Sequence, residues 1–238
     1  HVRSRRQRQM CIRDRDRAFG SESSLVERQV SAAIRGLHAN NVLACAKHFP
    51  GHGDTTKDSH FDLPFVKKSL EELRKVELKP FYKASKSRVE FVMMAHLVVD
   101  AIDTELPCTL SKKAYDFLRD ELKYKKIIVT DDMEMKAISK HYSYPESAKL
   151  ALEAGADLLV YRSMETAKEA YDGVMNYIKE RELNKNHLNE KITRVLDCKK
   201  RFFKEYKPTY IPGLSKVFKK DQNSKLLSQL MPDTSVRG

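Results

Sequence analysis

The stretch Lys126-Ile-Ile-Val-Thr-Asp-Asp132 places two carboxylates directly after a short apolar run. Three further runs are equally short, rich in aliphatic residues and apolar on both faces: Val42–Ala46, Glu90–Ala95 and Ala156–Tyr161. Runs of this kind are typical of strands buried in a parallel sheet. The sequence therefore predicts four parallel strands, the third of which covers Lys126–Thr130.

Helix-like stretches alternate with these runs, and they cover residues 21–39, 69–87, 111–122, 145–154, 164–181 and 186–205. Ser69 and Glu72 match a capping box, and Ser111 is placed to cap the next helix. Gly155 follows a helix directly and is expected to end it. The alternation of strands and helices predicts right-handed βαβ units and an α/β fold.

The formal net charge of +12 invites a nucleic-acid partner, but it sits at the two ends of the chain. Residues 18–198 contain as many acidic as basic residues, and no basic stripe interleaved with aromatic residues marks a strand-binding groove. No apolar run reaches the roughly 18 residues that a membrane helix requires. We therefore expect neither a nucleic acid nor a membrane as a partner.

The two ends differ in pattern from the rest of the chain. Residues 1–16 are dense in arginine with almost no apolar periodicity, which predicts a foreign or disordered segment; a basic arm that binds an acidic surface is the alternative. Residues 204–238 form a basic tail without a core pattern. The four cysteines form no CxxC pair and fit a reducing compartment such as the cytoplasm. The cell envelope stays open, because a chain that begins with His could have lost an export signal.

The densest group of chemically active residues lies in the stretch Lys47-His-Phe-Pro-Gly-His-Gly-Asp-Thr-Thr-Lys-Asp-Ser-His60. Two glycines and a proline predict a loop with special backbone angles. Asp58 and His60 are one residue apart, so in an extended loop the carboxylate can orient the imidazole and the pair can exchange a proton near neutral pH. The alternative is that Asp58 caps a turn and His60 lies on the surface.

A metal site is a second alternative, since His48, His52, Asp54 and His60 could all be ligands. Against it, the spacing from His48 to His52 falls in a Gly-Pro loop, where the facing geometry of two ligands on one helix is absent.

The carboxylates after Thr130 lie where α/β proteins place their chemistry, at the carboxyl end of a buried strand. Asp132 is expected to cap the helix that follows. Asp131 would then be free to act as a nucleophile or to stabilise a cationic transition state.

Taken together, these segments resemble glycoside hydrolase family 3, and within it the bacterial β-N-acetylglucosaminidases. The resemblance runs over residues 17–203. The motifs that carry it are Arg17-Ala-Phe-Gly20, Ala46-Lys-His-Phe-Pro-Gly-His-Gly-Asp54, Asp58-Ser-His60, Met94-Ala-His96, Leu106-Pro with Thr109-Leu-Ser111, Val129-Thr-Asp-Asp-Met133 and Ala154-Gly-Ala-Asp157.

The resemblance implies retaining hydrolysis of terminal β-linked N-acetylglucosamine on a (βα)₈ barrel, with a small carbohydrate as substrate and no metal or organic cofactor. It assigns the nucleophile to Asp131 and the acid/base role to His60, which Asp58 would hold. The residues that it assigns to the sugar hydroxyls are Arg17, Lys47 and His48.

A complete barrel of this type has eight strands and about 250 residues. The four strands found here correspond to the fifth to eighth, so we expect an incomplete barrel of about four βα units. Such a half-barrel would be an incomplete catalyst with open sheet edges that favour self-association. A metal-dependent hydrolase and a non-catalytic sugar-binding module are the alternative functions.

Overall fold

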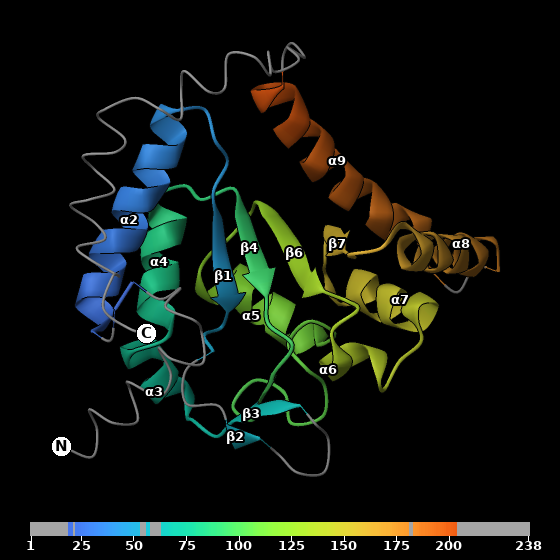
Figure 1. Ribbon diagram of the computed structural model, residues 1–238, viewed down its shortest axis with the longest axis horizontal. Coiled ribbons are helices and arrows are strands. Elements are labelled where there is room, and N and C mark those ends of the chain that lie inside the picture. The colour runs from blue at the N-terminus through green and yellow to red at the C-terminus, as the bar shows by residue number, and fades with distance from the viewer. Residues whose placement is uncertain (1–18, 21, 53–55, 58–62, 181–182, 204–238) are drawn as a thin grey trace, which may run out of the picture. The chain divides into compact units, whose positions relative to one another are not determined.

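The structure is a computed structural model that describes residues 19–20, 22–52, 56–57, 63–180 and 183–203. Its centre is a sheet of four parallel strands in the order β1-β4-β6-β7. Figure 1 shows these strands side by side, with their carboxyl ends at one edge. Their bounds are β1 (Cys45–Phe49), β4 (Phe91–Met94), β6 (Ile127–Asp132) and β7 (Leu158–Val160). The predicted α/β fold with about four βα units is confirmed.

Eight helices are found in the described part of the chain, and most begin where the sequence predicts. Ser69 makes both hydrogen bonds of the predicted capping box, the Ser111 side chain caps its helix, and Gly155 ends another at φ +139°. The bounds are α2 (Ser23–Ala39), α3 (Leu70–Lys75), α4 (Leu78–Lys86), α5 (Lys112–Glu121), α6 (Lys136–Ser139), α7 (Tyr144–Ala154), α8 (Met164–Lys179) and α9 (Lys185–Phe202).

The predicted position of the first strand is wrong by three residues. The strand begins at Cys45 and not at Val42, which is exposed in the loop after α2. The reason is that β1 lies at one edge of the sheet and has exposed positions, Cys45 and Lys47, so its own apolar pattern is weak. Lys47 and His48 therefore lie on the strand itself.

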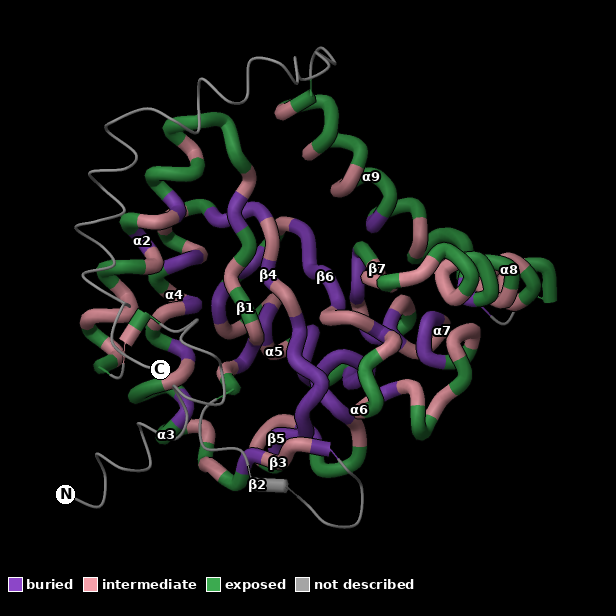
Figure 2. Tube along the Cα trace, viewed as in Figure 1, coloured by how far each residue is buried: buried purple, intermediate pink, exposed green. Residues whose placement is uncertain are grey.

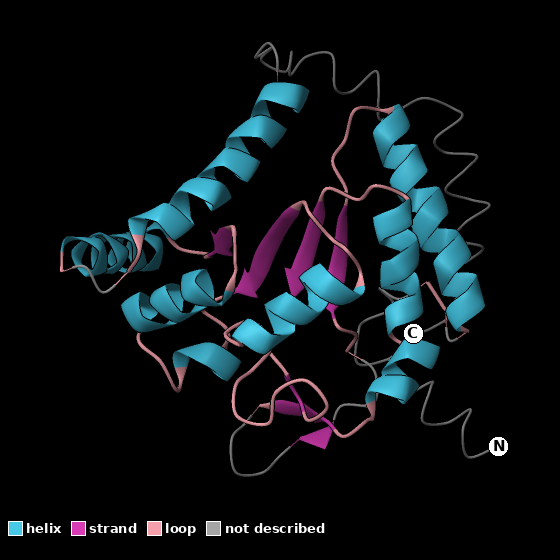
Figure 3. Ribbon diagram, turned by 180° about the vertical axis from the view of Figure 1, so that it is seen from behind, coloured by secondary structure: helices cyan, strands magenta, loops and turns pink. Residues whose placement is uncertain are grey.

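The two faces of the sheet differ in burial. One face carries Val92, Met94 and Ile128, all buried in the main core, and in the view from behind α5 crosses this side of the sheet (Figure 3). The other face carries Cys45, which is exposed, and Phe91 in register with it, which is half-buried. Figure 2 shows that β6 is largely buried, whereas the outer helices α8 and α9 are largely exposed. The second face is thus more open toward β1, whereas Ile127 and Val129 of β6, on that same face, are buried.

A second, small sheet was not predicted. It joins β2 (Thr56–Lys57), β3 (Pro64–Val66) and β5 (Val98–Val99), and it lies beyond the carboxyl ends of the main strands (Figure 1). Strands of two or three residues have no recognisable alternation in the sequence. The small sheet forms part of the surroundings of the loop that follows β1.

Two helix predictions also differ from the structure. The predicted helix 69–87 is divided at Val76 and Glu77 into α3 and α4, and the four-residue α6 was not expected. None of the described helices is long and apolar enough to cross a bilayer.

Candidate active site at the carboxyl edge of the sheet

Asp131 lies near the end of β6, and one oxygen of its carboxylate is hydrogen-bonded to the main chain. Its Oδ1 accepts a hydrogen bond of 2.8 Å from the main-chain N–H of Asp132. Its Oδ2 lies 3.4 Å from Nε2 of His48, and 22% of the side chain is exposed. One carboxylate oxygen is therefore anchored by the main chain, and the other faces an imidazole in a position that solvent reaches.

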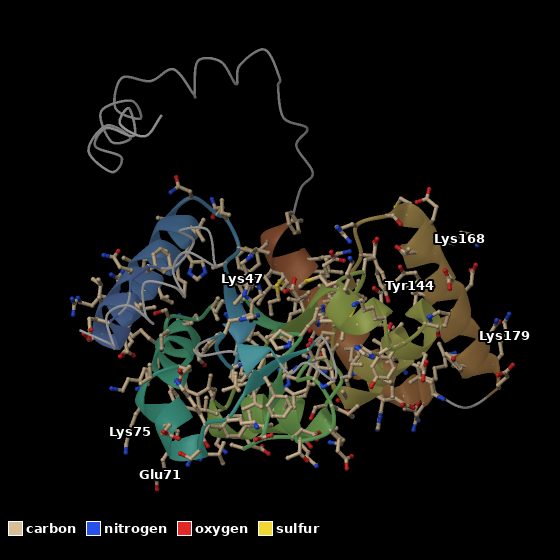
Figure 4. The ribbon with its side chains drawn as sticks, turned by 60° about the horizontal axis from the view of Figure 1, so that its bottom comes forward. Lys47, Glu71, Lys75, Tyr144, Lys168 and Lys179 are labelled. Carbon is tan, nitrogen blue, oxygen red and sulfur yellow. The ribbon has the colours of Figure 1, made fainter. Side chains whose placement is uncertain are left out.

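His48 reaches Asp131 across the sheet from β1, the edge strand. Its side chain is 15% exposed, and its ring lies edge-on to the His52 ring, with 6.0 Å between the centroids. Lys47, the preceding residue, is exposed (labelled in Figure 4). The structure thus brings two predicted site residues, His48 and Asp131, into direct contact, and Lys47 precedes His48 on β1.

The turn after β1 has the special backbone that its Pro and Gly residues predict. The Lys47–His48 and Phe49–Pro50 peptide bonds are cis, and Gly51 has φ +126°. A Cβ on Gly51 would lie 2.6 Å from Cβ of Glu77, so a larger residue would meet the start of α4. This close approach requires glycine.

The prediction that Asp132 caps the following helix is wrong. The residue before α6 is Met135, which makes no side-chain cap. Asp132 instead accepts a hydrogen bond of 2.9 Å from the N–H of Glu134 through Oδ1 and pairs with Arg162 at 2.7 Å through Oδ2. Its carboxylate therefore stabilises a tight turn and is paired with an arginine, whereas Oδ2 of Asp131 faces His48.

Glu134 connects the end of β6 to the start of α8. One oxygen, Oε1, accepts hydrogen bonds from the main-chain N–H groups of Arg162 and Ser163 and from the hydroxyl of Thr166, at 2.6 to 2.8 Å. These bonds hold the pKa of Glu134 below its usual value, the Ser163 N–H being the largest cause. The carboxylate stabilises the loop behind Asp131, a role that sequence analysis did not assign.

His96 lies at the carboxyl end of β4, where it is buried beside the same turn. Its Nδ1 is 2.8 Å from the hydroxyl of Thr109, and its Nε2 is 2.8 Å from the carbonyl oxygen of Asp132. Burial lowers the pKa of His96, against the raising effect of the Asp132 carbonyl and of the Asp131 and Asp132 carboxylates. In the sequence, His96 stood out only as part of the motif Met94-Ala-His96. No role was predicted for it.

Three predicted site residues, Arg17, Asp58 and His60, lie outside the described residues, and so does Asp54 of the alternative metal set. Within the described part of the chain, no group of three His, Cys, Asp or Glu side chains is arranged to hold a metal ion. Of the alternative ligands, His48 and His52 are described, and they contact each other through their rings.

The arrangement supplies the parts of a nucleophilic centre at the edge of a parallel sheet. A carboxylate with one anchored oxygen cannot rotate freely, so its other oxygen keeps a fixed direction toward a reacting atom. The neighbouring imidazole can hydrogen-bond to a ligand hydroxyl or to the carboxylate itself.

The model of the glycosyl hydrolase family 3 N terminal domain matches residues 6–198 of the chain. The chain belongs to glycosyl hydrolase family 3. The resemblance inferred from the sequence motifs is thereby confirmed, together with the barrel-type α/β fold.

Curated relatives of the chain include proteins named Beta-hexosaminidase. One, from Stenotrophomonas maltophilia, is 33% identical over 159 residues, which are 67% of this chain and 48% of the relative. The other, from Tolumonas auensis, is 34% identical over 164 residues, which are 68% of this chain and 49% of the relative. The chain thus spans about half the length of these relatives.

Solved structures share the arrangement of the elements. A β-N-acetylglucosaminidase from Paenibacillus sp. strain FPU-7 superposes with a TM-score of 0.82 and 36% identity, over 90% of this chain and 41% of that one. CbsA from Thermotoga neapolitana superposes with a TM-score of 0.72 and 35% identity, over 77% of this chain and 41% of that one.

Proposed function

We propose that the protein is a retaining glycoside hydrolase that removes terminal β-linked N-acetylglucosamine, with Asp131 as its nucleophile. The support for the reaction class is membership of family 3 and similarity to proteins named Beta-hexosaminidase. The support for Asp131 is its geometry: one oxygen is anchored on the Asp132 N–H, and the other is partly exposed beside His48.

In the first step, Oδ2 of Asp131 attacks the anomeric carbon as the bond from that carbon to the leaving-group oxygen breaks. A glycosyl ester forms on Asp131, and the leaving oxygen takes a proton from a general acid. Water then attacks the same carbon, the acid group takes a proton from that water, and the ester bond to Asp131 breaks. Two inversions leave the product with the β configuration of the substrate.

We assign the acid/base role to His60, oriented by Asp58, on the loop after β1. An imidazole is suited to this role because it exchanges protons near neutral pH. Lys47, His48 and Arg17 are assigned to the sugar hydroxyls. The contact between His48 and Asp131 supports this for His48, since a side chain beside the nucleophile also lies beside the sugar ring that the nucleophile attacks.

The substrate proposed here is a small N-acetylglucosamine-containing glycoside, such as a fragment derived from peptidoglycan. The names of the relatives support the acetamido sugar, which cell-wall fragments and chitin fragments both contain. A panel of both kinds of oligosaccharide decides between them.

The proposal is tested with the full-length protein and an aryl β-N-acetylglucosaminide. We expect hydrolysis that a chelator leaves unchanged, and a loss of about 10⁴-fold or more in kcat for Asp131→Asn. Asp116→Asn is the matched control, because Asp116 is an exposed acid on α5 that pairs with Lys112. It should retain wild-type activity.

Two outcomes would replace the proposal. Activity that a chelator abolishes and added zinc restores would favour the metal-dependent hydrolase. Saturable binding of the sugar without turnover would favour the binding module.

A further inference from the structure

His96 occupies a buried position between two main-chain segments at the carboxyl edge of the sheet. It is 3% exposed, and both of its ring nitrogens lie at 2.8 Å from a polar partner. A buried ring with both nitrogens bonded is held in one orientation, since any rotation leaves a polar atom without a partner.

The partner of Nε2 determines the direction of that hydrogen bond. A carbonyl oxygen can only accept, so Nε2 carries a proton and donates it to the Asp132 carbonyl. The ring therefore holds the main chain of Asp132 in place from the side of β4.

The partner of Nδ1 is the hydroxyl of Thr109. The Thr109 hydroxyl has one proton, and it lies 2.8 Å from Nδ1 and 2.9 Å from the carbonyl oxygen of Ala95. Burial lowers the pKa of His96, which favours the neutral ring. In the neutral ring with a proton on Nε2, Nδ1 accepts, so the single proton of the Thr109 hydroxyl is shared between Nδ1 and the carbonyl oxygen of Ala95.

Asp132 is the residue whose N–H anchors Oδ1 of Asp131 at 2.8 Å. Its carbonyl is held by His96, and its side chain is held by Arg162 and by the Glu134 N–H. We propose that His96 is a positioning residue for the nucleophile: its Nε2–H fixes the main chain of Asp132, whose own N–H sets the direction of the Asp131 carboxylate.

This inference rests on the proposed role of Asp131 and adds a requirement to it. If the Asp132 main chain shifts, the Asp131 carboxylate that is bonded to it shifts as well. A displacement of a catalytic group by about 1 Å can lower the rate by about 10²-fold. Binding of the sugar involves other residues, so the loss should appear in kcat far more than in KM.

Two substitutions at the same position separate positioning from packing. His96→Asn places its amide near the position of Nδ1, so it can contact Thr109 but does not reach the Asp132 carbonyl. His96→Gln is longer and can present an amide N–H where Nε2–H stood. We expect His96→Asn to lower kcat by about 10²-fold with little change in KM, and His96→Gln to recover most of that loss.

A second pair keeps the test independent of how well the His96 variants fold. Thr109→Ser keeps the hydroxyl that holds Nδ1, and Thr109→Val removes it with little change in size. Thr109→Ser should behave as wild type, whereas Thr109→Val should lower kcat. His187→Asn, at an exposed position on α9, is the matched control and should leave kcat unchanged.

The outcomes are distinguishable. Wild-type kcat in His96→Asn, equal losses in His96→Asn and His96→Gln, or equal kcat in Thr109→Ser and Thr109→Val would each overturn the positioning role and leave the proposed function standing. A wild-type protein that neither hydrolyses the aryl glycoside nor depends on Asp131 would overturn the proposed function, and the positioning role with it.

Discussion

The carboxylate of Asp157 accepts a hydrogen bond of 2.8 Å from the main-chain N–H of Ile128, the second residue of β6. The same side chain, which is fully buried, pairs with Arg119 of α5 at 3.0 Å and with Arg194 of α9 at 2.8 Å. One buried acid therefore connects two helices to the strand that carries Asp131.

We expect Asp157→Asn to destabilise the fold by about 3 kcal/mol, because it leaves two arginines facing a neutral amide in a buried setting. The measurement is the free energy of unfolding in urea. Asp172→Asn is the control, since Asp172 is exposed on α8 beside Lys168, and it should cost no more than about 0.5 kcal/mol. Equal losses in the two variants would contradict this role for Asp157.

Two glycines should respond to alanine with opposite signs. Gly155 has φ +139°, and a Cβ there would lie 2.9 Å from Cβ of Tyr115, which is buried. Gly155→Ala should therefore cost at least about 1–3 kcal/mol. Gly36 lies within α2 and a Cβ there would meet nothing within 4 Å, so Gly36→Ala should stabilise by about 0.5–1 kcal/mol. Urea unfolding of both variants checks the signs, and a stabilised Gly155→Ala would contradict the account.

Stability at acid pH should depend on Glu121. Arg74 donates two hydrogen bonds to its carboxylate, at 2.9 and 2.8 Å, and Tyr82 donates a third. These bonds, those from Arg74 first, lower the pKa of Glu121 to about 2. Because the unfolded value is about 4.3, the stabilisation is complete above that pH and is lost as the pH falls toward 2.

The measurement is the urea midpoint of wild type and Glu121→Gln between pH 7 and pH 2. The gap between the two proteins should be widest above about pH 5 and should narrow as the pH falls. Glu153→Gln, at an exposed position on α7, is the control and should show no such narrowing. A gap for Glu121→Gln that stays constant down to pH 2 would show that this carboxylate is not preferentially charged in the fold.

The sequence predicted the positions of the strands that have a neighbouring strand on each side. β4 and β6 lie inside the sheet, and their predicted positions are close to those observed. The strand at the edge, β1, was misplaced because Cys45 and Lys47 are exposed on it, so local hydrophobicity pointed to the loop before it.

The site was predictable to the extent that its side chains carry the chemistry. Asp131 and His48 were both expected, and the structure brings them together. The contacts of His96 with the Asp132 carbonyl and of Glu134 with two N–H groups were not predicted, because main-chain partners leave no residue-specific signal in the sequence.

The loss of activity caused by removing His60, the proposed general acid, should depend on the leaving group of the substrate. A phenol with a low pKa departs with little help from a proton, whereas a sugar alcohol requires protonation. We expect His60→Ala to keep much of the first step with an activated aryl glycoside and to lose about 10²-fold or more with a disaccharide. Steady-state kinetics on the two substrates test this, and equal losses on both would argue against an acid/base role for His60.

As the proposed nucleophile, Asp131 must form a covalent bond to the sugar. Incubation of the full-length protein with a fluorinated N-acetylglucosaminyl fluoride that slows the second step, followed by proteolysis and mass spectrometry, tests it directly. The account predicts one added glycosyl group on the peptide that contains Asp131, and no adduct in Asp131→Asn. An adduct on another residue, or active enzyme that forms no adduct and releases a product of inverted configuration, would contradict it.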